Sequence, residues 1–496
     1  MYTEVEVAAR AASTSFCIFT ACKQERNQSM EQKSNYLAEE KIGKLIFQFS
    51  IPCILSLMVS SLYNIVDQIF IGHGVGYLGN GATNVVFPIT IITLALALMI
   101  GDGCAAYLSI CQGRRDTESA HRSVGSAVVL TLVLGVLLTA LFALAREQIL
   151  VAFGATENNI GYAREYFDCI LIGIPFYMLT NALNSVIRAD GSPKFAMLST
   201  LAGCLLNVIL DPVAIFILGW GMRGAALATI FGQIVTALLA VYYLFHTKTF
   251  RLKKDSFRPS RRILAKFLPL GVSSFLTQLS IVVIMAVMNN VLVRYGAASN
   301  YGADIPLTVV GIVMKVFQIV IAVVVGIAAG AQPIVGYNFG RGEFGRVKQI
   351  YAAIIKAECV VGVVSTVCFE LFPLQITAIF GSEDGLYNEF AVYAFRIFLC
   401  TILLCCVQKA TSIFLQAMGK PVLSMSLSLL REFILSVPLA LLLPRAFGVI
   451  GALYSAPIAD VVSVAAAAVI MVRVYRELGG QERRQAENAV ELPSNF

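Results

Sequence analysis

Long apolar runs recur along the whole chain, and they restrict its possible folds more than any other feature. A run of about 20 apolar residues crosses the hydrocarbon core of a bilayer as a helix. Twelve candidates occur, at about 45–71, 84–110, 124–145, 165–187, 195–219, 224–245, 263–293, 305–330, 347–370, 391–416, 421–443 and 448–472. Because these runs are continuously apolar and not alternating, they predict helices and not the strands of a membrane barrel. The sequence therefore predicts an all-α polytopic membrane protein with twelve transmembrane helices.

The composition excludes an ordinary soluble protein. Of the 496 residues, 58% are hydrophobic and 14% are charged, against about 45–50% and about 25% in soluble domains. The net charge of +7 is typical of loop charge in a membrane protein, so no nucleic-acid partner is expected. The 12 Cys show no C-x-x-C or Cys/His spacing, which indicates small buried side chains and neither disulfides nor zinc.

Lys and Arg are distributed unequally between alternate connections. The connections on one side, both ends of the chain included, carry 23 of them, and those on the other side carry 5. The positive-inside rule then predicts a multi-pass protein of the cell membrane with both termini in the cytoplasm.

Three short motifs recur at one offset and predict a duplicated architecture. Gly113, Ala189 and Gly224 each open or close a motif that returns 227 or 228 residues later, at Gly340, Ala417 and Gly451. Both halves hold six spans and start on the same side, so we expect a parallel repeat about an axis near the membrane normal. The expected organisation is an N-terminal extension at 1–40, a six-helix lobe at 41–246, a basic cytoplasmic linker at 247–262, a second six-helix lobe at 263–475 and a cytoplasmic tail at 476–496.

The first residues match neither a membrane span nor a signal peptide. Residues 11–22 are short and partly apolar, and no basic segment precedes them. We expect a disordered extension, and an alternative is that Met30 is the physiological start.

Ionisable side chains inside the spans mark functional sites or paired structural contacts. They are Asp67, Asp102 and Asp211 in the first half, and Lys315, Lys356, Glu358, Arg396, Lys409, Arg431 and Glu432 in the second.

Polar residues of the first half gather at one depth. Asn207 precedes Asp211 by one turn, and Pro212 bends the helix and frees a backbone acceptor beside them. With a rise of about 1.5 Å per residue, Asp211, Thr229 and Asp67 lie roughly 13, 9 and 7 Å from the outer helix ends. The pattern predicts a site for H⁺ or Na⁺.

The second half lacks this pattern. Residues 227 positions after Asn207 and Asp211 are Ile434 and Pro438. Lys315 and Glu432 lie near mid-bilayer and are expected to pair with each other or with Arg431, in a transport role or a purely structural one.

Enzyme motifs are absent. The three His make no H-x-x-x-H, and neither a nucleotide-binding loop nor a G-x-S-x-G occurs. We therefore expect no enzyme and no cofactor, and transport driven by an ion gradient.

The motifs resemble those of the multidrug and toxic compound extrusion (MATE) family over about residues 41–475. They are Phe49 to Pro52, Ser61 to Gly72, the Gly-rich second span up to Gly113, Ile187 to Lys194 and Asn207 to Pro212. The resemblance implies a two-lobe secondary transporter that exports amphipathic and cationic drugs in exchange for Na⁺ or H⁺.

Similarity to the DinF-like branch implies the roles of single residues. The cation site maps onto Asp67, Asn207, Asp211 and Thr229, with Tyr166 and Asn184 in the surrounding polar network and Pro52 as a bending point. Tyr166 and Asn184 are 18 residues apart, roughly 27 Å along a helix, so both cannot touch one ion. Asp102 departs from the small residue expected there and has no assigned role.

Other functions stay open at this point. A flippase for lipid-linked oligosaccharide shares the architecture, and Lys315, Arg396 and Arg431 would suit an anionic headgroup. A signalling receptor or an intramembrane enzyme is a third alternative. The expected partners are the lipid bilayer and amphipathic small molecules, and the expected state is a monomer.

The charge distribution generates a test of topology. Reporter fusions or cysteine labelling should place 248–262 and the segment after Arg473 in the cytoplasm, because 23 of the 28 flanking cations lie on that side. Labelling of either segment by an impermeant external reagent would contradict the orientation.

Overall fold

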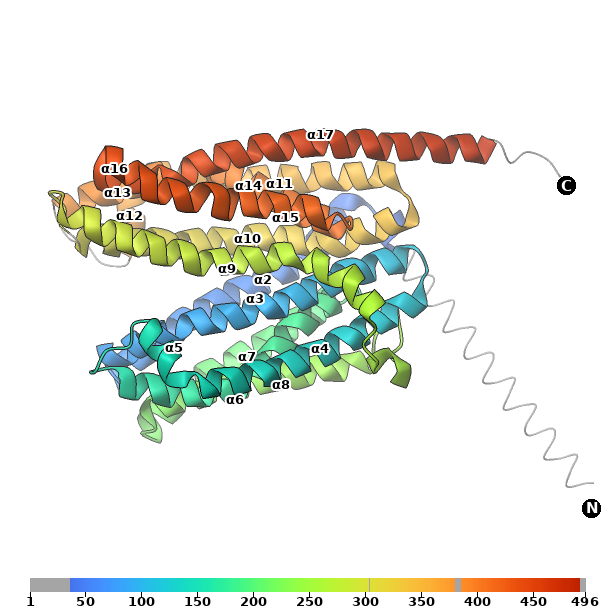
Figure 1. Ribbon diagram of the computed structural model, residues 1–496. Coiled ribbons are helices and arrows are strands. Elements are labelled where there is room, and N and C mark those ends of the chain that lie inside the picture. Colours follow the sequence, from blue (N-terminus) through green and yellow to red (C-terminus); the bar gives the residue numbers. More distant parts are fainter. Residues whose placement is uncertain (1–35, 303, 380–384, 491–496) are drawn as a thin grey trace, which may run out of the picture.

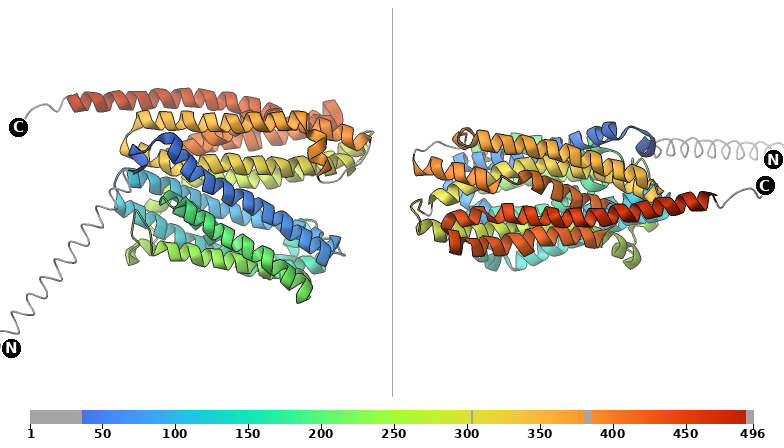
Figure 2. Two further views of the ribbon diagram at one scale, coloured as in Figure 1. Left: turned by 180° about the vertical axis from the view of Figure 1, so that it is seen from behind. Right: turned by 90° about the horizontal axis from the view of Figure 1, so that it is seen from above.

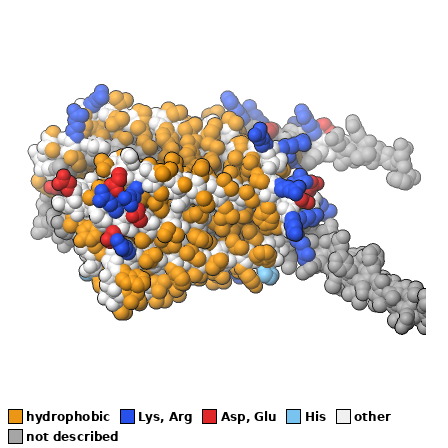
Figure 3. Space-filling view, turned by 60° about the horizontal axis from the view of Figure 1, so that its bottom comes forward, with side chains coloured by type: hydrophobic (Ala, Val, Ile, Leu, Met, Phe, Trp, Pro, Cys, Tyr) orange, Lys and Arg blue, Asp and Glu red, His pale blue; other side chains and the backbone are white. Residues whose placement is uncertain are grey.

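The computed structural model describes residues 36–302, 304–379 and 385–490, and the described part is a bundle of helices without strands (Figure 1). Eleven helices are long and apolar enough to cross a membrane, and α13 with α14 forms a further span that is bent by 42°. Counted in this way the spans number twelve, and the predicted all-α membrane fold is confirmed. Figure 3 shows a belt of hydrophobic side chains between two ends that carry the charged ones.

The first half comprises seven helices and one π-helix. Their bounds are α2 Ile42–Gly74, α3 Tyr77–Gly113, α4 Thr117–Leu144, α5 Arg146–Ala152, α6 Ile160–Ala189, α7 Pro193–Pro212, the π-helix η1 Val213–Ile217 and α8 Gly221–Leu244. Proline at the first position of α7 favours the helix start, because its missing N–H has no partner there anyway. Asp116 caps α4 by accepting a hydrogen bond from Ser119 N at 3.0 Å.

The second half repeats this order. A short 3₁₀ helix, η2 Lys254–Phe257, lies in the linker; then come α9 Arg261–Ala297, α10 Asp304–Arg341, α11 Phe344–Leu371, α12 Pro373–Ala378, α13 Leu386–Phe398, α14 Ile402–Ala417, α15 Pro421–Leu429, the π-helix η3 Leu430–Ser436, α16 Val437–Leu453 and α17 Ser455–Val490. The starts of α4 and α11, Thr117 and Phe344, are 227 residues apart, which is the offset of the sequence motifs.

Each half sends the beginning of its first helix against the other half. Leu45 and Phe49 of α2 pack in one apolar cluster with residues of α10 and α14, and Phe267 of α9 packs with residues of α3 and α6. Figure 2 shows α2 crossing from the helices of the second half to those of the first. This exchange joins the two lobes, α2–α8 and α9–α17.

Glycines allow the lobes to approach to backbone contact. An added Cβ would lie 2.4 Å from Phe267 O at Gly103, 1.7 Å from Met99 O at Gly271, 2.1 Å from Tyr337 O at Gly113 and 2.2 Å from Ile110 O at Gly340. These contacts lie toward the end of the bundle that holds the linker, here called the linker end, where Gln112 donates to Thr249 at 2.7 Å. The lobes are thus closely joined in the linker half of the bundle.

Several boundaries differ from the prediction. The predicted span 391–416 is interrupted between Phe398 and Ile402, and most helices extend several residues beyond the apolar run. The predicted tail after 476 continues α17 as far as Val490, with Lys348 paired to Glu482 at 2.7 Å.

The N-terminal extension is only partly described. Residues 36–40 pack on the second lobe, where Asn338 Nδ2 donates to Leu37 O at 3.1 Å, in contrast to the disorder expected up to residue 40. Residues 1–35, and with them the alternative start at Met30, lie outside the described residues.

Asp190 fastens the linker to the first lobe. Its carboxylate accepts hydrogen bonds from Lys248 N at 2.7 Å, Thr249 N at 2.9 Å and the Tyr243 hydroxyl at 2.7 Å. The beginning of the linker is therefore held against the α6–α7 turn.

This contact predicts protease sensitivity. Asp190→Ala should speed trypsin cleavage at Arg251, Lys253 and Lys254 by about tenfold or more, because each hydrogen bond to a charged group contributes about 1.5–3 kcal/mol against local opening. Cleavage of the purified protein is followed by mass spectrometry. Asp116→Ala, which removes a helix cap at the same end, is the matched control, and an equal effect of both variants would disprove the anchoring role.

Candidate cation site in the first lobe

Asn207 and Asp211 lie one turn apart on α7 and face the interior of the first lobe. Asn207 Nδ2 donates to Asp211 Oδ1 at 3.1 Å and to the Thr229 hydroxyl of α8 at 3.2 Å. Asn207 and Asp211 are 2% and 0% exposed. The structure therefore brings together three of the four residues predicted for a cation site.

Close packing of α7 on α8 makes these contacts possible. A Cβ at Gly203 would lie 2.1 Å from Thr236 Oγ1, and one at Gly232 would lie 2.6 Å from Gly203 O. The two glycines let the helix backbones approach, so the short side chains of Asn207 and Thr229 reach each other.

Asp67 supplies the fourth residue from α2. Its side chain is buried, and its carboxyl group lies within range of a direct interaction with that of Asp211. Tyr166 of α6 is buried close to both carboxyl groups. The site thus unites side chains from α2, α6, α7 and α8.

Three oxygens of this site are buried without a described hydrogen-bond partner. They are Asp67 Oδ1, Asn207 Oδ1 and Asp211 Oδ2. Buried polar atoms are normally satisfied, and two carboxylates side by side in a low dielectric repel each other. No described Lys or Arg forms an ion pair with either aspartate. Oxygen atoms of this kind fit a hard monovalent cation such as Na⁺, or a proton held by one carboxyl group.

The end of α7 is irregular beside the site. Pro212 has no N–H to donate to Val208 O, and the chain continues as the π-helix η1. Irregular helix turns of this kind recur at functional sites. The predicted irregularity at Pro212 is therefore present next to Asp211.

Asn184 and Pro52 lie elsewhere. Asn184 Nδ2 donates to Thr200 Oγ1 at 3.2 Å, and Thr200 is two turns before Asn207 on α7. α2 continues as one helix through Pro52, next to the lobe contact where Ser50 Oγ donates to Ile327 O at 3.2 Å. Neither residue joins the carboxylates in this conformation.

The second lobe contains a buried cluster of paired charges. Arg431 donates to Asp460 Oδ1 at 2.8 Å and to Glu432 Oε1 at 2.9 Å, and Lys409 contacts Glu432 at 2.8 Å. Two cations thus balance two anions. Lys315 is exposed on α10 and has no ion pair within the described residues, so the expected pairing of Lys315 with Glu432 is wrong.

Sequence reasoning missed Asp460, although it stands in the predicted span 448–472. Its position inside an apolar run was the available signal. Thr401 Oγ1 also donates to it, at 2.9 Å, from the bend between α13 and α14. The cluster therefore ties the broken tenth span to η3 and α17.

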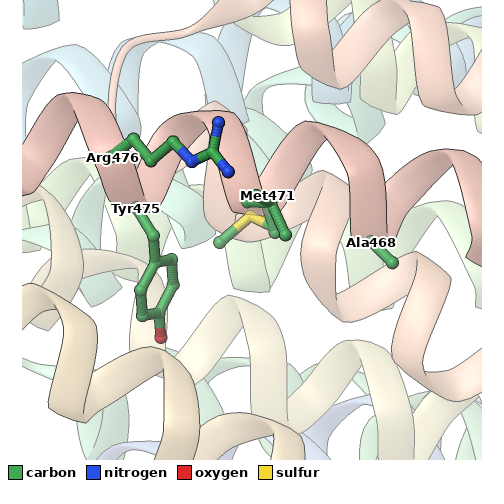
Figure 4. A pocket seen from close by; sticks show the side chains of 5 residues that line it. Ala468, Met471, Tyr475 and Arg476 are labelled. Carbon is green, nitrogen blue, oxygen red and sulfur yellow. The ribbon is translucent and has the colours of Figure 1, made fainter.

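A surface hollow on α17 is separate from both groups of charges. Figure 4 shows it lined by Ala468, Met471, Tyr475 and Arg476. Its lining comes from a single helix and is mainly apolar, so it contributes nothing to cation binding.

The paired charges generate a stability prediction. Arg431→Met should lower the free energy of unfolding by about 3–5 kcal/mol, because it leaves Glu432 and Asp460 buried without this cation. Thermal unfolding in detergent measures the loss. Arg445→Met, at an exposed position on α16, is the control, and a stability of Arg431→Met equal to that of the control would show that the cluster is not structural.

Comparisons with known proteins agree on one family. The MatE family model matches residues 52–213 and 271–442. The chain is 25% identical over 448 residues to the multidrug export protein MepA of Staphylococcus saprophyticus, which covers 89% of this chain and 96% of that protein.

Two solved structures are similar over most of their length. One is a MATE protein in the bent conformation, with a TM-score of 0.82, 26% identity and coverage of 92% of this chain and 99% of the other. The second is a MOP superfamily transporter from Pyrococcus furiosus, whose binding pocket of reverse polarity suggests a different function, with a TM-score of 0.83, 26% identity and coverage of 90% and 99%. The family model covers more than half of the chain, and the chain therefore belongs to the MATE family, as its motifs predicted.

Proposed function

We propose that this protein exports amphipathic and cationic small molecules across the cell membrane in exchange for Na⁺ or H⁺. The observation that carries the proposal is the pair of buried carboxylates, Asp67 and Asp211, which no described cation of the protein neutralises. The name of MepA as a multidrug export protein supports the substrate class.

Coupling follows from the cost of burying charge. With the site empty, Asp67 and Asp211 repel each other, which favours a first lobe that keeps them apart or hydrated. A proton or Na⁺ removes that repulsion and lets α2 and α7 pack more closely. Drug and ion then favour different arrangements of the lobe, so binding of one releases the other.

The named residues divide the task between them. Asp67 and Asp211 hold the charge, whereas Asn207 and Thr229 supply neutral oxygens for Na⁺ or hydrogen bonds for a protonated carboxyl group. Pro212 and η1 give α7 a place to bend, and Pro52 gives α2 one beside the lobe contact. Tyr166 encloses the pair from α6. An ion that moves through the full potential supplies about 2.3 kcal/mol per 100 mV, which is about 50-fold in a substrate gradient.

In the proposed orientation the linker end faces the cytoplasm, in accord with the Lys and Arg count. The termini then lie on the same side. We propose a monomer that acts through its two lobes, without enzymatic activity and without a cofactor other than the coupling ion.

The geometry does not favour a flippase for lipid-linked oligosaccharide. Such a protein needs free cations for a diphosphate, but Arg431 is paired with Asp460 and Glu432, and Arg396 lies 3.6 Å from Glu370. The first lobe offers carboxylates, which attract organic cations and repel phosphates.

Neutralising either carboxylate should uncouple transport. Asp211→Asn and Asp67→Asn should each reduce gradient-driven export of a cationic dye by at least about 50-fold, because an amide neither binds a proton nor contributes a charge to Na⁺. Purified protein in proteoliposomes, with an imposed Na⁺ or H⁺ gradient, gives the rates and identifies the ion.

Asp168→Asn is the matched control, because Asp168 is a half-exposed aspartate of α6 paired with Arg146. Its export rate should equal that of the parent. Export at the parent rate by both Asp67 and Asp211 variants, with unchanged ion dependence, would exclude the first-lobe coupling site.

A further inference from the structure

Asp102 lies where α3 passes between the two lobes. A Cβ at the preceding residue, Gly101, would lie 2.6 Å from the Cα of Ala182 in α6. One at the following residue, Gly103, would lie 2.4 Å from Phe267 O in α9. Asp102 is therefore set between first-lobe and second-lobe backbones that are in direct contact with its own helix.

The two carboxylate oxygens of Asp102 have partners in different lobes. Ser185 of α6 donates to Oδ1 at 2.6 Å, and Ser274 of α9 donates to Oδ2 at 2.8 Å. Arg188 of α6 lies 3.8 Å from Oδ1 and also donates to Ser185 Oγ at 2.9 Å. One oxygen is thus bound by the first lobe and the other by the second.

Further bonds extend the second-lobe side. Gln416 Nε2 of α14 donates to Ser274 Oγ at 3.3 Å, and Gln332 Nε2 of α10 donates to the backbone oxygen of Asp102 at 3.3 Å. Three helices of the second lobe, α9, α10 and α14, therefore contact or support this one residue of α3.

The internal repeat provides a comparison. The position 227 residues after Asp102 is Ala329, and its neighbour Gly330 makes the equivalent lobe contact, 2.6 Å from the Cα of Ser50 for an added Cβ. That contact contains no acidic side chain from α10. A carboxylate is thus present in one of the two related contacts, and close backbone packing does not require it.

We propose that Asp102 is a positioning residue of the transport cycle, which holds the lobes together in the linker half through Ser274 and releases them when the linker end opens. The proposal rests on the proposed alternating access.

Release leaves the carboxylate charge compensated. When α9 moves away, Oδ2 loses Ser274, but Oδ1 keeps Ser185 and the nearby Arg188, which move with α3 in the same lobe. The contact can therefore form and break without leaving a bare buried charge, whose cost would otherwise lock one conformation.

The test compares two serine variants that each remove one hydroxyl from the same carboxylate. Ser274→Ala breaks the contact between lobes, and Ser185→Ala breaks a contact within the first lobe. Hydrogen–deuterium exchange of the full chain in nanodiscs, without drug or ion gradient, reports on both ends of the bundle.

Ser274→Ala should speed exchange about tenfold in segments 105–113 and 334–341, which carry the linker-end glycine contacts, and slow it in segments 63–74 and 305–315 at the opposite end. Ser185→Ala should leave both ends close to the parent. A merely destabilised protein would exchange faster at both ends, and this result would overturn the proposal, as would parent-like exchange in Ser274→Ala or equal effects of the two variants.

The outcome separates this proposal from the proposed function. Opening of the linker end in Ser274→Ala, in a protein whose parent form exports nothing under an ion gradient, would retain the lobe contact and reject the coupled export. Export by the parent with no response of Ser274→Ala would do the reverse.

Discussion

A charge inside a membrane protein must be compensated, and the protein meets this requirement differently in each part. In the second lobe, Arg431 and Lys409 balance Asp460 and Glu432 by direct contact. At the lobe contact, Asp102 is held by hydroxyl groups from both lobes, with Arg188 nearby. In the first lobe no described cation pairs with the two aspartates, so a proton or an ion from solution must complete the site. A charge satisfied internally stabilises a lobe, whereas one that needs an external partner makes its conformation depend on that partner.

Much of the fold could be predicted because a bilayer leaves the backbone few alternatives. Twelve apolar runs became twelve spans once the bent α13–α14 pair is counted as one, and the repeat offset of 227 is preserved in the starts of α4 and α11. The interruption between Phe398 and Ile402 was not predictable, because Leu399 to Thr401 contains neither proline nor glycine and its break depends on tertiary packing. The extension of α17 beyond Arg476 was missed because hydropathy detects the hydrocarbon core and not the polar continuation of a helix.

The grouping of Asn207, Asp211 and Thr229 could be predicted because helix periodicity and depth are both read from spacing. The contact of Asp67 with Asp211 depends on how α2 crosses between the lobes, and only the family resemblance pointed to that pairing. Sequence spacing excluded a shared ion for Tyr166 and Asn184, and Asn184 indeed bonds to Thr200. Pairing in the second lobe was not accessible in the same way, because the choice between Lys315 and Lys409 as partner of Glu432 depends on which faces of α10 and α14 turn inward.

The repeat duplicates the helices and leaves the chemistry different in each lobe. Positions equivalent to Asn207 and Asp211 hold Ile434 and Pro438, and the position equivalent to Asp102 holds Ala329. An ion that binds only in the first lobe acts first on α2 and α7, and α2 begins against the second lobe. A shift of α2 therefore reaches the lobe contact directly, through Ser50 and Gly330, on the side of the interface opposite to Asp102 and Ser274. Two related contacts of unequal polarity allow one to act as a packed pivot while the other breaks, so an asymmetric ion site can drive a nearly symmetric pair of lobes.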